Sequence, residues 1–117
     1  MNPPPMRRLL RNLTILGLAS SAWLAHGQAL DVAAAEALAK KSNCTKCHSV
    51  DKKKDGPSYK EVAVKYKGKP DAQDRIVKHL TTGEKAKFPD GHEEEHKIIK
   101  AKDAAEVKNL VDWILAQ

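Results

Sequence analysis

Apolar residues recur at helical spacing in four segments of the chain, and the stretches between these segments are polar. The expected helices cover residues 32–42, 59–66, 71–82 and 104–116. Asp31 precedes the alanine-rich first segment as a good N-cap, and Gly83 closes the third. Asp103 and Glu106 have the spacing of a capping arrangement at the start of the last segment. The pattern predicts an all-α domain.

Residues 84–102 lack this periodicity and contain Pro89 and Gly91. They are expected to form mainly a long loop, with at most one turn around the HEEEH sequence, and no strand or internal repeat is predicted. Loops of this length in small domains are usually functional or disordered.

The N-terminal part of the chain has a different pattern. Three arginines precede an apolar run at 13–24, and small residues follow, including Gly27 and Ala29. This order is typical of a secretory signal peptide. An uncleaved membrane anchor is the alternative, but the run is shorter than the roughly 20 residues that a bilayer span needs. We expect a signal peptide at 1–29, cleaved after Gly27 or Ala29, and a periplasmic domain at 30–117 with no membrane span.

Charge and size narrow the possible functions of that domain. Three of the 21 basic residues lie in the leader and all 15 acidic residues follow it, which leaves residues 30–117 with a net charge of +3. This weak positive charge suits an acidic protein partner and does not indicate nucleic-acid binding. A domain this small, with few aromatic side chains, usually needs a cofactor, metal or disulfide for stability.

The only two cysteines stand in the sequence Cys44-Thr45-Lys46-Cys47-His48. A C-x-x-C-H sequence is typical of covalent haem attachment. Two residues between the cysteines place both sulfurs on one side of a helical turn, where each can reach a haem vinyl group. The adjacent His48 can then bind the iron. One haem c is therefore expected, held by Cys44, Cys47 and His48.

Three other uses of these residues agree less well with the sequence. A redox-active Cys44–Cys47 disulfide leaves His48 unexplained, and no strand–helix alternation surrounds the motif. A Cys2His2 zinc site would need His92 and His96 far closer to the cysteines than they are. The sequence from His92 to His96 also matches the H-E-x-x-H signature of zinc proteases, but that signature requires a helix and a further ligand.

The chain after the leader resembles the class I c-type cytochromes along nearly its whole length. C-T-K-C-H follows a first helix, Gly56-Pro57 comes at the usual interval, and Trp113 is a late aromatic in the last helix. The resemblance implies an all-helical wrap around one haem, with the first and last helices crossing near Trp113. It also implies that the Pro57 carbonyl accepts a hydrogen bond from His48. Class II cytochromes carry their motif near the C-terminus and do not fit.

The axial methionine usual in that family has no counterpart, because the only methionines are Met1 and Met6. Counted back from Trp113, the family's methionine would fall close to Lys97. His96 is therefore the expected sixth ligand, and His92 would need about four more residues of slack. His79 is expected to be solvent-exposed on the third helix, and a five-coordinate iron is the remaining alternative.

Two histidine ligands would complete the coordination sphere of the iron. They would also lower its reduction potential relative to that of a methionine-ligated haem. We therefore expect an electron carrier and not an enzyme. It should be a monomer that exchanges electrons with periplasmic or membrane-bound redox proteins. The alternative function is binding of a small gas or peroxide at an open or exchangeable sixth position.

Overall fold

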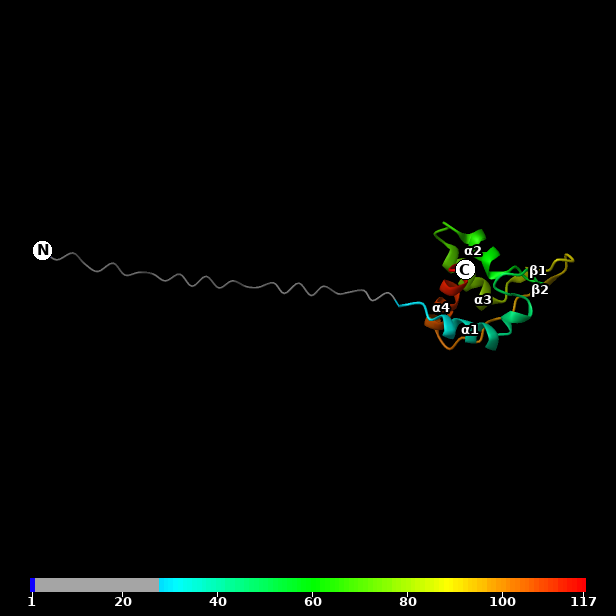
Figure 1. Cartoon of the computed structure of the whole chain (residues 1–117), viewed down its shortest axis with the longest axis horizontal. Coiled ribbons are helices and arrows are strands. Elements are labelled where there is room, and N and C mark those ends of the chain that lie inside the picture. The colour runs from blue at the N-terminus through cyan, green and yellow to red at the C-terminus, as the bar shows by residue number, and fades with distance from the viewer. Residues whose placement is uncertain (2–27) are drawn as a thin grey trace.

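The computed structural model describes Met1 and residues 28–117, so the predicted signal peptide lies almost entirely outside the described residues. Residues 32–115 form four α-helices, one 3₁₀ turn and a short hairpin (Figure 1). In chain order they are α1 (Val32–Lys41), η1 (Cys44–Lys46), α2 (Tyr59–Tyr66), α3 (Ala72–Thr82), β1 (Lys85–Lys87), β2 (Glu93–Glu95) and α4 (Ala104–Leu115). The four predicted helices are confirmed to within one residue at each end. None of the helices in the described part is long and apolar enough to cross a membrane.

Local side chains explain where the helices begin and end. The Asp31 carboxylate accepts a hydrogen bond from the Ala34 amide at 2.9 Å, and Ser58 forms a full capping box with Glu61 at the start of α2. Gly83 ends α3 with a φ of +67°, a conformation that glycine adopts without strain. These contacts are set by neighbouring residues, which is why the sequence pattern locates the helices well.

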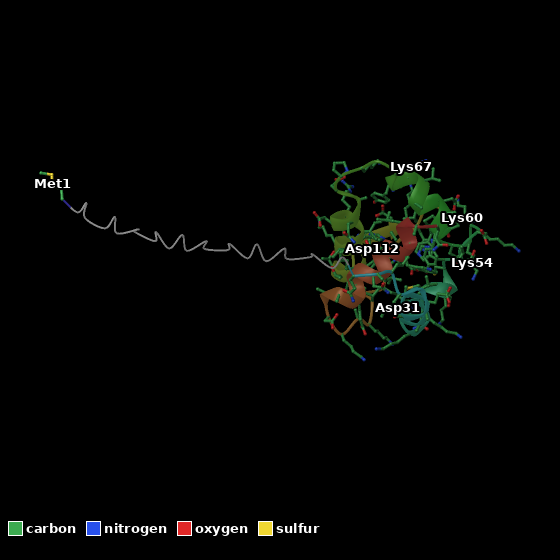
Figure 2. The ribbon with its side chains drawn as sticks, turned by 60° about the vertical axis from the view of Figure 1, so that its left-hand side comes forward. Met1, Asp31, Lys54, Lys60, Lys67 and Asp112 are labelled. Atoms are coloured by element: carbon green, nitrogen blue, oxygen red, sulfur yellow. The ribbon has the colours of Figure 1, made fainter. Side chains whose placement is uncertain are left out.

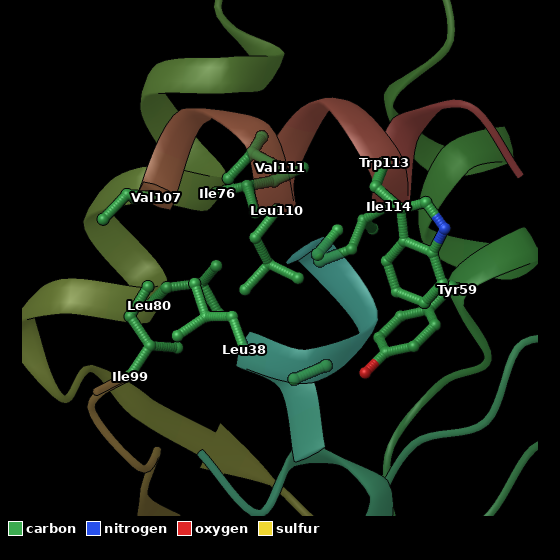
Figure 3. Close-up of a cluster of buried hydrophobic side chains, with 12 residues drawn as sticks. Leu38, Tyr59, Ile76, Leu80, Ile99, Val107, Leu110, Val111, Trp113 and Ile114 are labelled. Atoms are coloured by element: carbon green, nitrogen blue, oxygen red, sulfur yellow. The ribbon is translucent and has the colours of Figure 1, made fainter. Parts of the chain in front are cut away.

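The core lies where α4 meets α1. Leu110 and Val111 are fully buried, and alanines on α1 let the two helices approach closely (Figure 3). At the start of α1 the Asp31 amide donates to Asn109 Oδ1 at 2.9 Å, and Asn109 Nδ2 donates back to the Asp31 carbonyl at 2.8 Å. This reciprocal pair joins the first and last helices. Trp113 is buried and meets the Tyr59 ring edge-on, with centroids 5.1 Å apart.

The prediction that residues 84–102 contain no strand is wrong. β1 and β2 form an antiparallel pair in which Lys85 lies opposite Glu95 and Lys87 lies opposite Glu93. Opposite charges on facing positions stabilise such pairs. At the tip, the Phe88 amide donates to the His92 carbonyl at 2.9 Å. Because the strands are short and mostly charged, they lack the apolar alternation that identifies a strand in sequence.

Candidate functional site

The cysteine motif lies on a turn immediately after α1. Asn43 takes the left-handed conformation with φ +59°, which asparagine tolerates better than most residues, and the 3₁₀ turn η1 then begins at Cys44. The amides of Cys47 and His48 both donate to the Cys44 carbonyl, at 3.2 and 2.9 Å. This compact turn holds Cys44, Cys47 and His48 together. Both cysteines are half-buried free thiols, and burial raises the pKa of Cys44.

These three side chains line a cavity of about 930 Å³, near the upper end of the usual range for ligand pockets. Apolar side chains from three helices form much of its wall: Tyr59, Val62, Tyr66, Ile76, Leu80, Leu110 and Ile114. The Tyr59 hydroxyl is buried, points away from Trp113 (Figure 3), and has no hydrogen-bond partner within the described part of the chain. A buried hydroxyl without a partner calls for an explanation. A large, mainly apolar cavity with two thiols and a histidine at its edge fits the haem expected from the motif.

His48 is oriented by the backbone of the Gly56-Pro57 turn. Its Nδ1 lies 2.7 Å from the Pro57 carbonyl oxygen. A carbonyl can only accept, so Nδ1 carries the proton and Nε2 keeps its lone pair. Nε2 is therefore the nitrogen available to a metal, in the tautomer that a carbonyl partner typically fixes in metal-bound histidines.

Gly56 lies directly against the His48 ring. A Cβ at this position would be 2.4 Å from His48 Cε1 and 2.8 Å from Nδ1, closer than side chains pack. In the sequence, Gly56 is visible only as part of a turn. The steric conflict with a larger residue becomes apparent only in the structure, where the His48 ring packs against the Gly56 backbone.

Gly56→Ala is therefore expected to push the His48 ring out of place. Overpacking of this kind lowers the free energy of unfolding by about 1–3 kcal/mol. The thermal midpoint of the haem-loaded protein should therefore fall, and the optical spectrum of its haem should change. Gly68→Ala is the matched control, since a Cβ there meets nothing within 4 Å despite a φ of +72°. It should be mildly destabilising with an unchanged haem spectrum. An unchanged spectrum and midpoint in Gly56→Ala would contradict the packing argument.

His96 follows β2 and is brought to the same cavity. Its ring centroid is 6.1 Å from that of His48, and its Nδ1 lies 2.9 Å from the Lys97 carbonyl oxygen. By the same reasoning as for His48, Nδ1 donates and Nε2 keeps its lone pair. Burial lowers the pKa of His96, with smaller contributions from the charges of His79 and His48, and this favours the neutral ring that metals bind.

His92 has a different environment and is not among the residues that line the cavity. Its Nδ1 pairs with Asp90, its Nε2 lies 3.2 Å from Glu94, and its ring stacks on Phe88 at 4.4 Å. The hydrogen bond to Asp90 is the main cause of a raised pKa for His92, with Glu94 adding to it. Both ring nitrogens are therefore engaged with carboxylates at the hairpin tip.

The expectation that His79 is solvent-exposed is only partly met, since its side chain keeps 37% relative exposure. His79 is half-buried, lines the cavity, and has its ring centroid 4.3 Å from that of His96. It follows the buried Ile76 by three residues, so it lies beside the buried face of α3. The lysines around it in the sequence hide this placement.

The zinc interpretations find no support in the geometry. Among the described residues, no three histidine, cysteine or acidic side chains are grouped so that they could hold a metal ion. The three glutamates between His92 and His96 form strand β2, and the segment is not helical.

Comparison with known proteins agrees with this site. Residues 32–117 match the family model for cytochrome c. Cytochrome c-551 from Allochromatium vinosum is 42% identical over 84 residues, which cover 67% of this chain and 80% of the relative. The crystal structure of the class 1 cytochrome MtoD from Sideroxydans lithotrophicus ES-1 matches with a TM-score of 0.72 and 64% identity, covering 75% of this chain and 97% of that one. Wild-type cytochrome c552 from Nitrosomonas europaea matches with a TM-score of 0.55 and 35% identity, over 68% of this chain and 95% of that one. With the paired cysteines at the edge of a haem-sized cavity, these matches show that the chain belongs to the cytochrome c family, as a small class I c-type cytochrome that carries electrons on one covalent haem c.

Proposed function

We propose that this cytochrome carries its electron on an iron bound by two histidines, His48 and His96. The observation that carries the proposal is the proximity of their rings, which both line the cavity and have centroids 6.1 Å apart. Two imidazoles that bind one metal ion from opposite sides, each through a bond of about 2 Å, have centroids about 6 Å apart. Both rings also have Nδ1 bonded to a backbone carbonyl, which leaves both Nε2 atoms free to bind.

The remaining residues have supporting roles in this proposal. Cys44 and Cys47 hold the haem covalently, and the Pro57 carbonyl keeps His48 in the binding tautomer. The bound haem supplies one-electron redox chemistry. With no methionine after Met6, the chain has no thioether to raise the potential, so the potential should lie below that of a methionine-ligated relative.

We also propose that the protein is exported and works in the periplasm as a monomer. The N-terminal leader supports export, with cleavage after Gly27 or Ala29. Charged side chains such as Lys54, Lys60 and Lys67 project from the domain surface (Figure 2). A net charge of +3 on residues 30–117 suits encounters with acidic redox partners, periplasmic or membrane-bound.

A redox titration of the purified protein, followed by optical and electron paramagnetic resonance (EPR) spectra, tests this function. Two histidine ligands should keep the iron low-spin in both oxidation states, and the ferrous protein should not bind carbon monoxide readily. A high-spin ferrous spectrum with rapid carbon monoxide binding would instead support a protein that binds a small gas or peroxide at an open sixth position.

A further inference from the structure

A third histidine adjoins the proposed ligand pair. The His79 ring packs against His96 with centroids 4.3 Å apart and planes tilted by 43°. His96 is half-buried, and its own ring makes one hydrogen bond, to the Lys97 carbonyl. Because the torsional preference of the Cβ–Cγ bond is broad, this single hydrogen bond and the packing around the ring are what oppose its rotation. The His79 ring, packed against His96 at this distance, supplies such packing.

His79 is itself held by Glu84. One carboxylate oxygen of Glu84 lies 3.5 Å from His79 Nδ1, and the other lies 2.9 Å from Lys78 Nζ. The two interactions fix the carboxylate between two adjacent side chains of α3. Glu84 therefore restrains the His79 ring through Nδ1, the ring nitrogen nearer the His79 backbone.

Hydrogen bonds also hold the backbone of the segment that begins at His96, and one of them is accepted by Glu84. The His96 amide donates to the Glu84 carbonyl at 3.0 Å, and the Ile99 amide donates to the Leu80 carbonyl of α3 at 3.0 Å. The Lys100 amide then donates to the buried Ser42 hydroxyl at 2.9 Å. Glu84 thus contacts the His96 main chain through its carbonyl and the ring that packs on His96 through its carboxylate.

We propose that His79 and Glu84 are positioning residues that hold the His96 ring in the orientation that binds iron. The inference rests on the proposed ligation by His96. His79 acts through ring packing, and Glu84 acts by keeping the His79 ring in place. Residues that orient a metal ligand typically change metal binding by about 10- to 100-fold when they are removed.

The test measures how fast carbon monoxide binds to the ferrous haem-loaded protein, because His96 must first leave the iron. His79→Ala should raise this rate by about 10-fold and change the ferric EPR spectrum, which reports ligand-ring orientation. Glu84→Gln, which keeps the backbone carbonyl, should raise the rate less. The double variant should be no faster than His79→Ala. Asp74→Asn is the control, since Asp74 is exposed on the same helix and is not among the residues that line the cavity, and it should match the wild type.

Each contrary outcome has a separate meaning. If His96→Ala opens the iron but His79→Ala binds carbon monoxide at the wild-type rate with an unchanged EPR spectrum, the positioning inference is overturned and the ligand pair stands. If the double variant is faster than His79→Ala, Glu84 does not act through His79. If His79→Ala opens the iron while His96→Ala stays low-spin, His79 is the ligand, and both the inference and the ligation proposal are wrong. Equal thermal midpoints for His79→Ala and Asp74→Asn would show that a faster rate is a local effect.

Discussion

His96→Ala is expected to change the iron from low-spin to high-spin and to make the ferrous protein bind carbon monoxide readily. His96 is half-buried at the cavity, has a free Nε2, and has its ring centroid 6.1 Å from that of His48. No methionine follows residue 6, so no thioether is available to take its place. The change should appear in optical and EPR spectra and as a shift of the reduction potential.

His92→Ala is the matched control for this experiment. His92 lies in the same segment but bonds to Asp90 and Glu94 and stacks on Phe88, so its loss should leave the iron low-spin. His96→Met is a second test, since a thioether that reaches the iron should restore six-coordination and raise the potential. If His92→Ala opens the site while His96→Ala stays low-spin, the ligand is four residues earlier than proposed. If neither variant has an effect, ligation from this segment is wrong.

Replacing both Cys44 and Cys47 by alanine is expected to leave the chain largely unfolded at room temperature. The haem-sized cavity of about 930 Å³ lies among side chains of α2, α3 and α4, which would face water or empty space without the cofactor. Each 100 Å³ of unfilled core costs about 2.4 kcal/mol. A small domain is stable by only about 5–15 kcal/mol in total, so a few hundred Å³ of void is enough to unfold it. A cofactor that binds only the folded state supplies folding free energy.

Far-ultraviolet circular dichroism and a thermal melt measure this effect, and the Soret absorbance reports any unattached haem. The control changes Thr45 and Lys46 to alanine, because both are exposed in the same motif and both cysteines remain. It should keep the helicity, the melt and the covalent haem of the wild type. Native-like helicity with a cooperative melt in the haem-free cysteine variant would contradict the expectation.

The limits of the helices were predictable because the signals are local. Asp31 and Ser58 cap the helices that they immediately precede, and Gly83 ends the helix that it follows. The start of α4 shows the limit of such reasoning. Asp103 caps the Glu106 amide as expected, but the Glu106 carboxylate accepts from Lys102 rather than from Asp103, so the capping box is incomplete.

The hairpin and the positions of the histidines were less predictable. β1 and β2 place opposite charges at facing positions, such as Lys85 and Glu95, and a pattern search within a single segment does not detect this pairing. His79 looks exposed among lysines in sequence and instead packs against His96, which is 17 positions later. This contact follows from the position of the segment after β2 beside α3, where the Ile99 amide donates to the Leu80 carbonyl.

The sequence by itself determined the class of this protein. The C-x-x-C-H motif, the helical periodicity and the lack of a late methionine are local or compositional features, so they do not depend on packing. The tertiary structure alone decided which side chains meet in the cavity. It brought His96 and not His92 near His48, placed His79 beside His96, and left no room for a side chain at Gly56. These choices arise from segments that are far apart in the chain, and only the folded backbone determines their separation.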